Sequence, residues 1–218
     1  MKKRPRFCLV WLLSLASIIV GRGSTSRAAA EEEGLAPDAT FKPLTEAELP
    51  AGFPTYTPVG TIEIKKYPAY RKAETSGRAA FFTLFTHIKS NGIAMTAPVE
   101  MTFKPEGVPV GQEQAMAFLY GSPDMGKAGK QGSVKVLDVP AATVVSIGVR
   151  GQRTDALVAK ATERLRSWLS ENKQSYVQEG PVRIMGYNSP FVARDRQFFE
   201  VQIPVGSVNA RDAQPAAR

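Results

Sequence analysis

Two segments of helical periodicity, each flanked by runs in which apolar and polar residues alternate, constrain the fold of this chain more than any other feature. In the first, apolar residues recur at i, i+3, i+4 and i+7, which predicts a helix over residues 77–90 with Ser76 as its N-cap. In the second, a similar stripe predicts a helix that begins at Thr154 or Asp155 and ends near residue 172. The stripes consist of Phe81, Leu84, Phe85 and Ile88, and of Val158, Ala161, Leu165, Trp168 and Leu169.

The alternating runs predict strands on both sides of each helix. Ile62 and Ile64 alternate with charged residues in a strand predicted over residues 60–71. Because both halves of the chain follow the order β-α-β-β, we expect an α+β fold with an internal duplication, in which two helices pack on an antiparallel sheet that forms a distorted β-barrel. Alternation points the side chains of Glu100 and Glu200 outward. The other predicted strands lie near residues 99–103, 116–120, 136, 145–149, 182–187 and 199–203.

The first 30 residues resemble a secretory signal peptide. Basic residues between Met1 and Arg6 precede an apolar run over residues 7–20, and small residues follow up to Ala30. This run is shorter than the roughly 18–20 residues that a membrane-spanning helix needs, and no later run is long enough either. We therefore expect export to the periplasm or the medium, without a stable membrane span in the mature chain.

The formal net charge of +8 is concentrated in the same segment. Six of the 28 basic residues lie before residue 31, where no acidic residue occurs, so 22 basic residues face 20 acidic ones in the rest of the chain. This balance gives no reason to expect a nucleic acid as a partner. The only cysteine, Cys8, also lies there, so the mature chain would have no disulfide, no thiolate ligand and no cysteine nucleophile.

Composition and periodicity predict where the folded domain begins and ends within the mature chain. Residues 31–55 contain three consecutive glutamates and four prolines, which is typical of a flexible leader that is either wrapped on the domain or dangling from it. The periodic patterns occupy residues 56–203, the expected domain. Residues 204–218 show no periodic pattern and are predicted to form a disordered tail.

The sequence contains no recognisable catalytic constellation. His87 is the only histidine, so a nucleophilic triad would need His87 itself, and a zinc site would consist almost wholly of carboxylates. The glycine-rich segment over residues 121–133 lacks the spacing and the strand-to-helix context of a nucleotide-binding loop. These absences favour a protein that is not an enzyme, although paired carboxylates could still converge in space.

One local run carries a family resemblance. Residues 80–101, AFFTLFTHIKSNGIAMTAPVEM, resemble the haem-binding SOUL family, in which a helix that ends in an aromatic-Ile-x-x-Asn element precedes a Met-Thr-x-Pro-Val strand. Later segments match in the same order, among them Ser122-Pro123 and the turn Gly186-Tyr187-Asn188-Ser189-Pro190. The resemblance covers about residues 56–203 and implies a distorted β-barrel of two repeated units with two helices. Two positions depart from the family pattern: His87 replaces a common tyrosine, and only Glu200-Val201 remains of an Arg-Asn-Glu-Val stretch.

The resemblance implies a haem-facing surface formed by Arg78, Phe81, Phe85 and Thr86. Such a surface would supply an apolar face for the porphyrin and a cation for a propionate. The alternative is that the two phenylalanines simply pack in the core and that Arg78 is a solvated charge. His87 is a candidate axial ligand of the haem iron, although it lies at the margin of the apolar stripe. Met95 and Tyr187 are weaker candidates.

Three functions remain open from the sequence. The first is an exported, non-enzymatic carrier or buffer for haem or a related tetrapyrrole. The second is a binding module for another amphipathic aromatic ligand, because similar duplicated folds hold cationic aromatics beside a buried glutamate; Glu100 or Glu200 would serve only if it pointed inward. The third is a haem-degrading or hydrolytic enzyme on the same scaffold, which would need a convergent cluster of polar groups in a cleft. The sequence names no protein partner.

Overall fold

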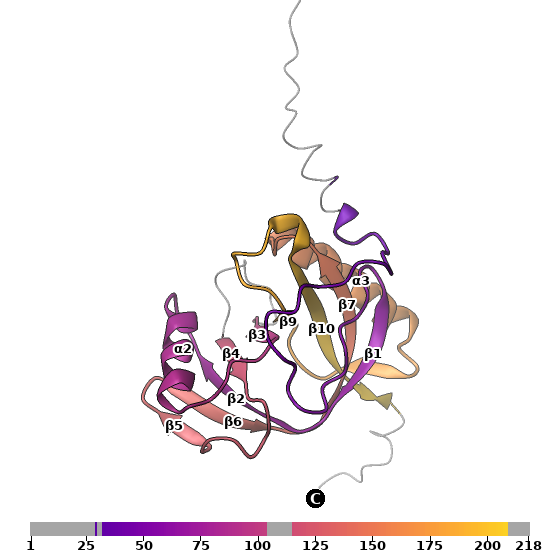
Figure 1. Ribbon diagram of the computed structural model, residues 1–218. Helices are drawn as coiled ribbons and strands as arrows, with labels where there is room; N and C mark the ends of the chain where they lie inside the picture. Colours follow the sequence, from indigo (N-terminus) through magenta and orange to yellow (C-terminus); the bar gives the residue numbers. More distant parts are fainter. Residues whose placement is uncertain (1–28, 30–31, 104–114, 209–218) are drawn as a thin grey trace, which may run out of the picture.

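The protein is an α+β structure in which two helices pack on a large antiparallel sheet (Figure 1). The computed structural model describes residue 29 and residues 32–103 and 115–208, so the predicted signal peptide and most of the predicted tail lie outside the described residues. The strands are β1 (Ile62–Tyr67), β2 (Tyr70–Thr75), β3 (Val99–Thr102), β4 (Ala115–Leu119), β5 (Gly129–Gln131), β6 (Val134–Val139), β7 (Ala142–Arg150), β8 (Tyr176–Gln178), β9 (Arg183–Gly186) and β10 (Phe198–Ser207). The helices are α2 (Ala80–Ser90) and α3 (Asp155–Glu171), with a short 3-10 helix at Arg194–Arg196.

The sheet is open and does not close into a barrel. Its strand order is β1-β7-β10-β9-β3-β4-β2-β6-β5, with β8 paired to β10, so β1 and β5 remain at opposite ends of the path of pairings. The prediction of a distorted β-barrel is therefore wrong: successive strands pair side by side, but the first and last strands of the path do not meet among the described residues. The α+β class and the antiparallel pairing are confirmed. The internal duplication stays a prediction.

The strand predicted over residues 60–71 is in fact two strands that diverge at Pro68. Proline lacks the N–H that a central ladder needs, so the pairing is interrupted there. β1 pairs with β7, whereas β2 pairs with β4 and β6 near the other end of the sheet (Figure 1). One short interruption thus lets a single extended segment contribute to both halves of the sheet.

Both helices cover the same face of the sheet. A row of cross-strand partners on that face runs from Ala73 in β2 to Val149 in β7 and is almost wholly apolar. α2 packs on β2, β4 and β6 at one end, and α3 packs on β7, β8 and β10 at the other. Each helix therefore encloses its own part of the core. The fully buried helical side chains include Leu84 in α2 and Ala161 and Leu165 in α3.

The two helix starts differ in how they are capped. The Thr154 hydroxyl accepts a hydrogen bond from the Leu157 amide at 3.3 Å, so the predicted cap of α3 is confirmed in its Thr154 form. α2 begins at Ala80, its N-cap is Ala79, and no side chain caps it. The prediction of Ser76 as N-cap and of a helix from residue 77 is therefore wrong, because a turn precedes the helix.

The leader is wrapped on the domain rather than dangling from it. Leu35 is fully buried in the core beneath α3. Residues 41–57, which we call the strap, cross the face of the sheet opposite the helices: the Ala51 amide donates to the Gly121 carbonyl at 2.8 Å, and the Ala97 amide to the Glu48 carbonyl at 2.9 Å. At the other end of the domain, Pro204–Ser207 continue β10. The tail predicted from residue 204 therefore begins too early, since the ladder with β7 and β8 extends past the last alternating residue.

Among the described residues, no helix is both long enough and apolar enough to span a membrane.

Candidate functional site

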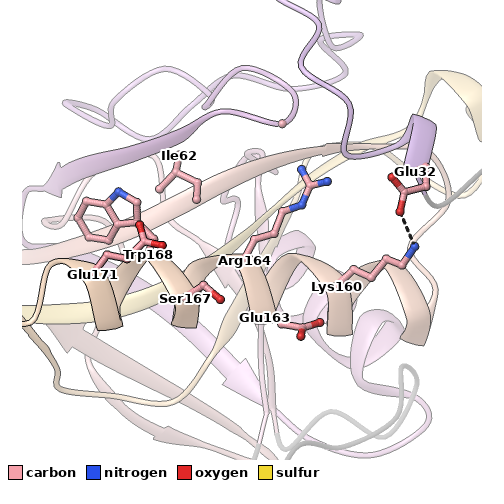
Figure 2. Close-up of a pocket in the computed structure, with 9 residues that line it drawn as sticks. Glu32, Ile62, Lys160, Glu163, Arg164, Ser167, Trp168 and Glu171 are labelled. Carbon is pink, nitrogen blue, oxygen red and sulfur yellow. Dashed lines mark hydrogen bonds and ion pairs between the residues drawn. The ribbon is translucent and has the colours of Figure 1, made fainter.

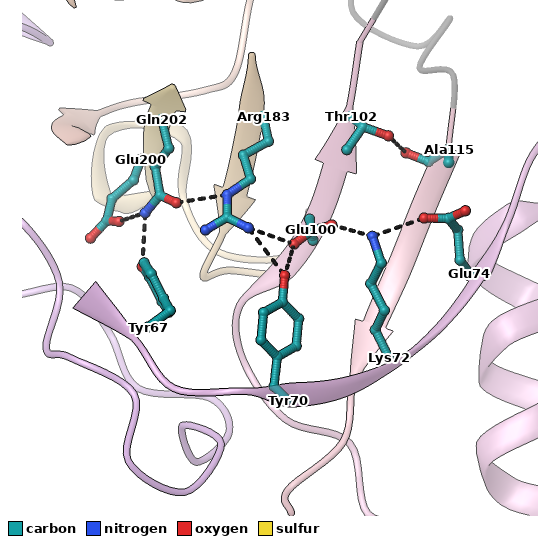
Figure 3. A network of polar contacts seen from close by, with 10 residues as sticks. All are labelled: Tyr67, Tyr70, Lys72, Glu74, Glu100, Thr102, Ala115, Arg183, Glu200 and Gln202. Atoms are coloured by element: carbon teal, nitrogen blue, oxygen red, sulfur yellow. Dashed lines mark hydrogen bonds and ion pairs between the residues drawn. The ribbon is translucent and has the colours of Figure 1, made fainter. Parts of the chain in front are cut away.

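The sheet face opposite the helices carries a buried row of charged and polar side chains (Figure 3). Glu100 in β3 and Glu200 in β10 both oppose Met185 in the central strand β9, so the two carboxylates lie on one face and in one row. Both side chains are almost inaccessible to solvent. The prediction that they point outward into solvent is wrong. Alternation does turn both side chains away from the helices, but the strap covers that face of the sheet and buries them.

Glu200 lies at one end of this polar network. Its carboxylate accepts two contacts from the Lys65 ammonium, at 2.7 and 3.0 Å, and one hydrogen bond from the Thr57 amide of the strap at 2.6 Å. The Tyr187 hydroxyl donates to the same carboxylate at 3.2 Å, and the Ser146 hydroxyl at 3.1 Å. The carboxylate is therefore paired with a buried cation and fully hydrogen-bonded, as burial of a charge requires.

Glu100 lies at the other end, between two cations. The Lys72 ammonium donates to it at 2.6 Å, the Tyr70 hydroxyl at 2.8 Å and the Arg183 guanidinium at 3.2 Å. Arg183 also donates through Nε to the Gln202 side chain at 3.0 Å, which connects the two ends into one network (Figure 3). No apolar replacement of one member would leave the others satisfied.

Burial and charge act in opposite directions on the Glu100 carboxyl. Burial alone would raise its pKa, but the charges of Arg183 and Lys72 and the hydrogen bonds from Lys72 and Tyr70 outweigh burial and lower it. Burial raises the pKa of Tyr67, Tyr70 and Tyr187, and the neighbouring carboxylate charges raise each of them further. The network thus holds its carboxylate charged and its phenols neutral at neutral pH.

The raised phenol pKa values predict loss of stability at alkaline pH. The unfolded chain releases phenolic protons near pH 10, whereas the folded chain retains those of Tyr67, Tyr70 and Tyr187, so their contribution is complete below pH 10 and falls as the pH rises above it. We expect these phenols to ionise only together with unfolding. The phenolate absorbance that these three side chains contribute should therefore rise in the same transition in which circular dichroism reports unfolding, and their ionisation while the fold persists would contradict the network.

A second candidate site is an exposed aromatic face on α2. Phe81 and Phe85 are 37% and 39% exposed, and Phe82 is 73% exposed. The rings of Phe81 and Phe85 stack at 6.4 Å with an interplanar angle of 8°, and Phe81 also meets the buried ring of Phe118 edge-on at 5.2 Å. The buried stripe of α2 is Ala80, Leu84 and Ile88. The two phenylalanines predicted at the haem-facing surface thus lie together at the edge of this stripe and are not plain core residues.

The other two residues predicted at this surface, Arg78 and Thr86, are near the phenylalanines in the sequence. Arg78 is exposed and belongs to the turn before α2, and Thr86 is exposed and follows Phe85 in the helix. Sequence reasoning missed two neighbours: Phe82, and Lys89, whose ammonium lies 5.6 Å from the centre of the Phe85 ring. The pair of consecutive phenylalanines was a signal for Phe82, since adjacent helical positions cannot both face the core.

His87 lies on the other side of α2 from the aromatic face. At about 100° per residue it is roughly 160° away from Phe85 around the helix axis. Its Nε2 atom is 2.8 Å from the Tyr120 hydroxyl and its Nδ1 atom 3.5 Å from the Asn91 amide. Burial lowers the pKa of the imidazole. A porphyrin resting on Phe81 and Phe85 would therefore not reach this imidazole. Tyr187 is likewise engaged by Glu200, and Met95 packs beside the core under α2.

A groove of about 540 Å³ runs along α3 (Figure 2). Trp168 and Ile62 form its apolar wall, and both of its basic side chains contact the leader: Lys160 pairs with Glu32 at 3.1 Å, and Arg164 donates to the Leu35 carbonyl at 2.7 Å. The groove lies at the opposite end of the sheet from α2 and contains none of the predicted site residues. Within the described residues, no group of three or more histidine, cysteine or carboxylate side chains could hold a metal ion.

The protein is thus a single-sheet α+β structure, and the exposed aromatic face of α2 is its candidate surface for a flat apolar ligand. The family model of the SOUL heme-binding protein matches residues 53–204, and the chain belongs to this family. No curated protein sequence matches the chain.

Solved structures with this fold share little sequence with the chain. EcmrR in a complex with DNA is 18% identical with a TM-score of 0.54, over 68% of this chain and 58% of that chain. The EcmrR C-terminal domain is 17% identical with a TM-score of 0.52, over 68% of this chain and 98% of that one. An uncharacterized conserved protein from Listeria innocua is 11% identical with a TM-score of 0.50, over 66% and 92%. At these identities the similarities concern the fold alone.

Proposed function

We propose that this protein binds haem or a related tetrapyrrole on the aromatic face of α2, as an exported, non-enzymatic carrier or buffer. The observation that carries the proposal is the exposure of Phe81, Phe82 and Phe85 side by side on one helix, in a chain of the SOUL heme-binding family. Single exposed apolar side chains are common on protein surfaces, whereas a contiguous cluster of large ones marks a binding surface. Export rests on the sequence of the first 30 residues.

The residues around the aromatic face suit the two parts of a porphyrin. The stacked rings of Phe81 and Phe85 would cover its apolar plane, and Arg78 and Lys89 supply cations for its propionates. A haem iron supplies redox and oxygen chemistry chiefly when a protein side chain ligates it. Among the described residues, no histidine or thiolate lies on this side of α2, because His87 faces away. The surface therefore fits a carrier better than a redox enzyme.

A hemin titration tests this proposal. Hemin should bind about 1:1 with a change in its Soret band, and Phe85→Ala should weaken binding by about 1–3 kcal/mol, roughly 5- to 150-fold in Kd. Phe191→Ala is the matched control, because Phe191 is also exposed, at 95%, but lies in a loop and not on α2. Arg78→Ala should have a smaller effect that salt reduces further. Equal weakening by both phenylalanine variants, or an unchanged Soret band, would contradict the proposal.

The same titration separates apolar binding from axial ligation. His87→Ala should leave the Soret maximum and the spin state unchanged, because the imidazole lies on the far side of the helix and contacts Tyr120. If the Soret maximum shifts in His87→Ala but not in Phe85→Ala, His87 would instead be an axial ligand of the iron. Circular dichroism of each variant must first establish that it folds.

A second candidate function is the binding of a different amphipathic aromatic ligand at the buried carboxylates. It is favoured by the inward position of Glu100 and Glu200. For a cationic ligand the arrangement is unfavourable, since Lys65 neutralises one carboxylate, and Lys72 with Arg183 neutralises the other. The same pairing leaves no free acid or base for an enzyme in this cluster.

A further inference from the structure

The buried network beneath the strap leaves one of its hydrogen-bond donor atoms without an acceptor among the described residues. Arg183 is 6% exposed, and its Nε and Nη1 atoms are used by Gln202, Tyr70 and Glu100. Its Nη2 atom is buried and has no hydrogen-bond partner among the described residues. The guanidinium lies 5.1 Å from the centre of the Tyr67 ring, which attracts the charge but offers no lone pair. A buried, unpaired guanidinium N–H is costly and marks the place of a missing acceptor.

The charges of the network also indicate that an acceptor is missing beside Arg183. Three cations, Lys65, Lys72 and Arg183, are buried with two fully buried carboxylates, Glu100 and Glu200. Glu74 is the third partner, but it pairs with Lys72 at 2.8 Å from the rim, where its side chain is 26% exposed. Three carboxylates thus face three cations, but Arg183 shares the Glu100 carboxylate with Lys72, so an anion beside Nη2 would have a cation with which to pair.

An aromatic ring of the strap closes this place. The Phe53 ring meets Tyr67 edge-on at 4.9 Å and Tyr70 edge-on at 5.3 Å, and these are the tyrosines that contact Arg183. Phe53 follows Gly52, whose φ of +75° allows the turn that directs the ring inward. Phe53 is only half-buried, so the ring is a plug at the surface rather than a core residue.

One part of the strap, around Leu44 and Glu46, is attached by exposed polar contacts that can exchange with water. Glu46 accepts hydrogen bonds from the Ser189 amide at 2.6 Å and from its hydroxyl at 2.8 Å, all between exposed groups. The Asn188 amide donates to the Leu44 carbonyl at 2.7 Å, also at the surface. Exposed polar contacts contribute little net stability, so local opening of this part of the strap requires much less free energy than unfolding of the sheet.

We propose that the face beneath the strap is a binding site for a small aromatic carboxylate. The ligand's ring takes the place of Phe53 between Tyr67 and Tyr70, and its carboxylate accepts hydrogen bonds from Nη2 of Arg183. This site is separate from the aromatic face of α2 and does not depend on tetrapyrrole binding there. The strap acts as a lid, and its Phe53 competes with the ligand.

The test uses three probes of similar shape and different charge: benzoate, benzyl alcohol and benzylamine. Removal of the plug in Phe53→Ala frees the ring site, so benzoate should bind roughly tenfold tighter to this variant than to the unmodified protein. Benzoate should also bind more tightly than the neutral and cationic probes. Calorimetry gives the affinities, and NMR shifts of the Tyr67 and Tyr70 rings give the location. Phe191→Ala, which truncates an exposed ring outside both proposed sites, is the matched control and should leave benzoate binding unchanged.

Three results would overturn the site: equal benzoate affinity in Phe53→Ala and the unmodified protein, a preference for benzylamine, or shifts confined to α2 or to the groove along α3. Arg183→Gln in the Phe53→Ala background should abolish the preference for benzoate. If that double variant does not fold, comparing the affinities of the three probes for Phe53→Ala still tests the site. Phe53→Leu also removes the aromatic ring but is a smaller change. Hemin binding is measured separately, so failure of either proposal is recognised independently of the other.

Discussion

Replacement of Glu100 by glutamine is expected to destabilise the fold by about 3–5 kcal/mol, because it leaves a buried guanidinium and a buried ammonium without their shared carboxylate. Glutamine keeps the shape of the side chain but removes its charge and places an N–H₂ group opposite either Lys72 or Arg183, which donate to different oxygens. The loss should appear as a lower denaturation midpoint at an unchanged m-value. Asp138→Asn, which removes the partner of Arg71 at the surface, should have a much smaller effect.

The pH dependence of the same comparison distinguishes a charge effect from a packing effect. The pKa of Glu100 is lowered in the folded protein, so its contribution is present above its ordinary value of 4.5 and is lost as the pH falls through the lowered value. The stability difference between the unmodified protein and Glu100→Gln should therefore shrink below pH 4.5. A difference that stays constant through this range would assign the loss to packing and not to the ion pairs.

Gly148→Ala is expected to destabilise the protein by about 1–3 kcal/mol through overpacking. A Cβ atom at this position of β7 would lie 2.6 Å from the Pro58 carbonyl oxygen and closer still to that of Thr57. Both contacts are with backbone, which cannot rotate away, and the Gly60 amide donates to the Gly148 carbonyl at 2.8 Å in the same place. Displacement of the strap here would also weaken the hydrogen bond from the Thr57 amide to Glu200.

Gly121→Ala is the control for this substitution. Its Cβ would meet the Met125 side chain at 3.6 Å, an ordinary contact with a flexible group, so stability should change little. Thermal or urea unfolding of the two variants measures the difference. Equal stability of both would show that the strap does not lie against β7 as described.

Much of the fold followed from periodicity. The helix over 155–171 and the strands around residues 99, 145 and 199 were predicted because their apolar faces pack on one core. The division of the first strand at Pro68 was not predicted, since alternation continues across the break and only the diverging partners reveal it. The end of β10 was set too early because Pro204 interrupts the alternation, although the strand continues to Ser207.

The candidate site was less predictable because it depends on what covers each face. Periodicity alone cannot tell whether a face opposite the helices is solvent or interior, and the strap decides this for Glu100 and Glu200. Likewise, the stripe of α2 included Phe81 and Phe85, but the narrow contact with the sheet is centred on Leu84 and leaves both rings partly exposed. The network around Arg183 links residues far apart in the chain, which no local pattern could bring together.

A map of where hemin contacts the protein tests most directly whether the aromatic face of α2 binds a tetrapyrrole. Unpaired electrons on the ferric iron broaden NMR signals of nearby nuclei, and phenylalanine and tryptophan rings can be labelled selectively, with a diamagnetic porphyrin as the control. We predict that added hemin broadens the ring signals of Phe81, Phe82 and Phe85 and leaves that of Phe191 sharp. Broadening centred on Trp168 in the groove along α3, or on Phe53 in the strap, with sharp signals from α2, would contradict a tetrapyrrole site on the aromatic face of this helix.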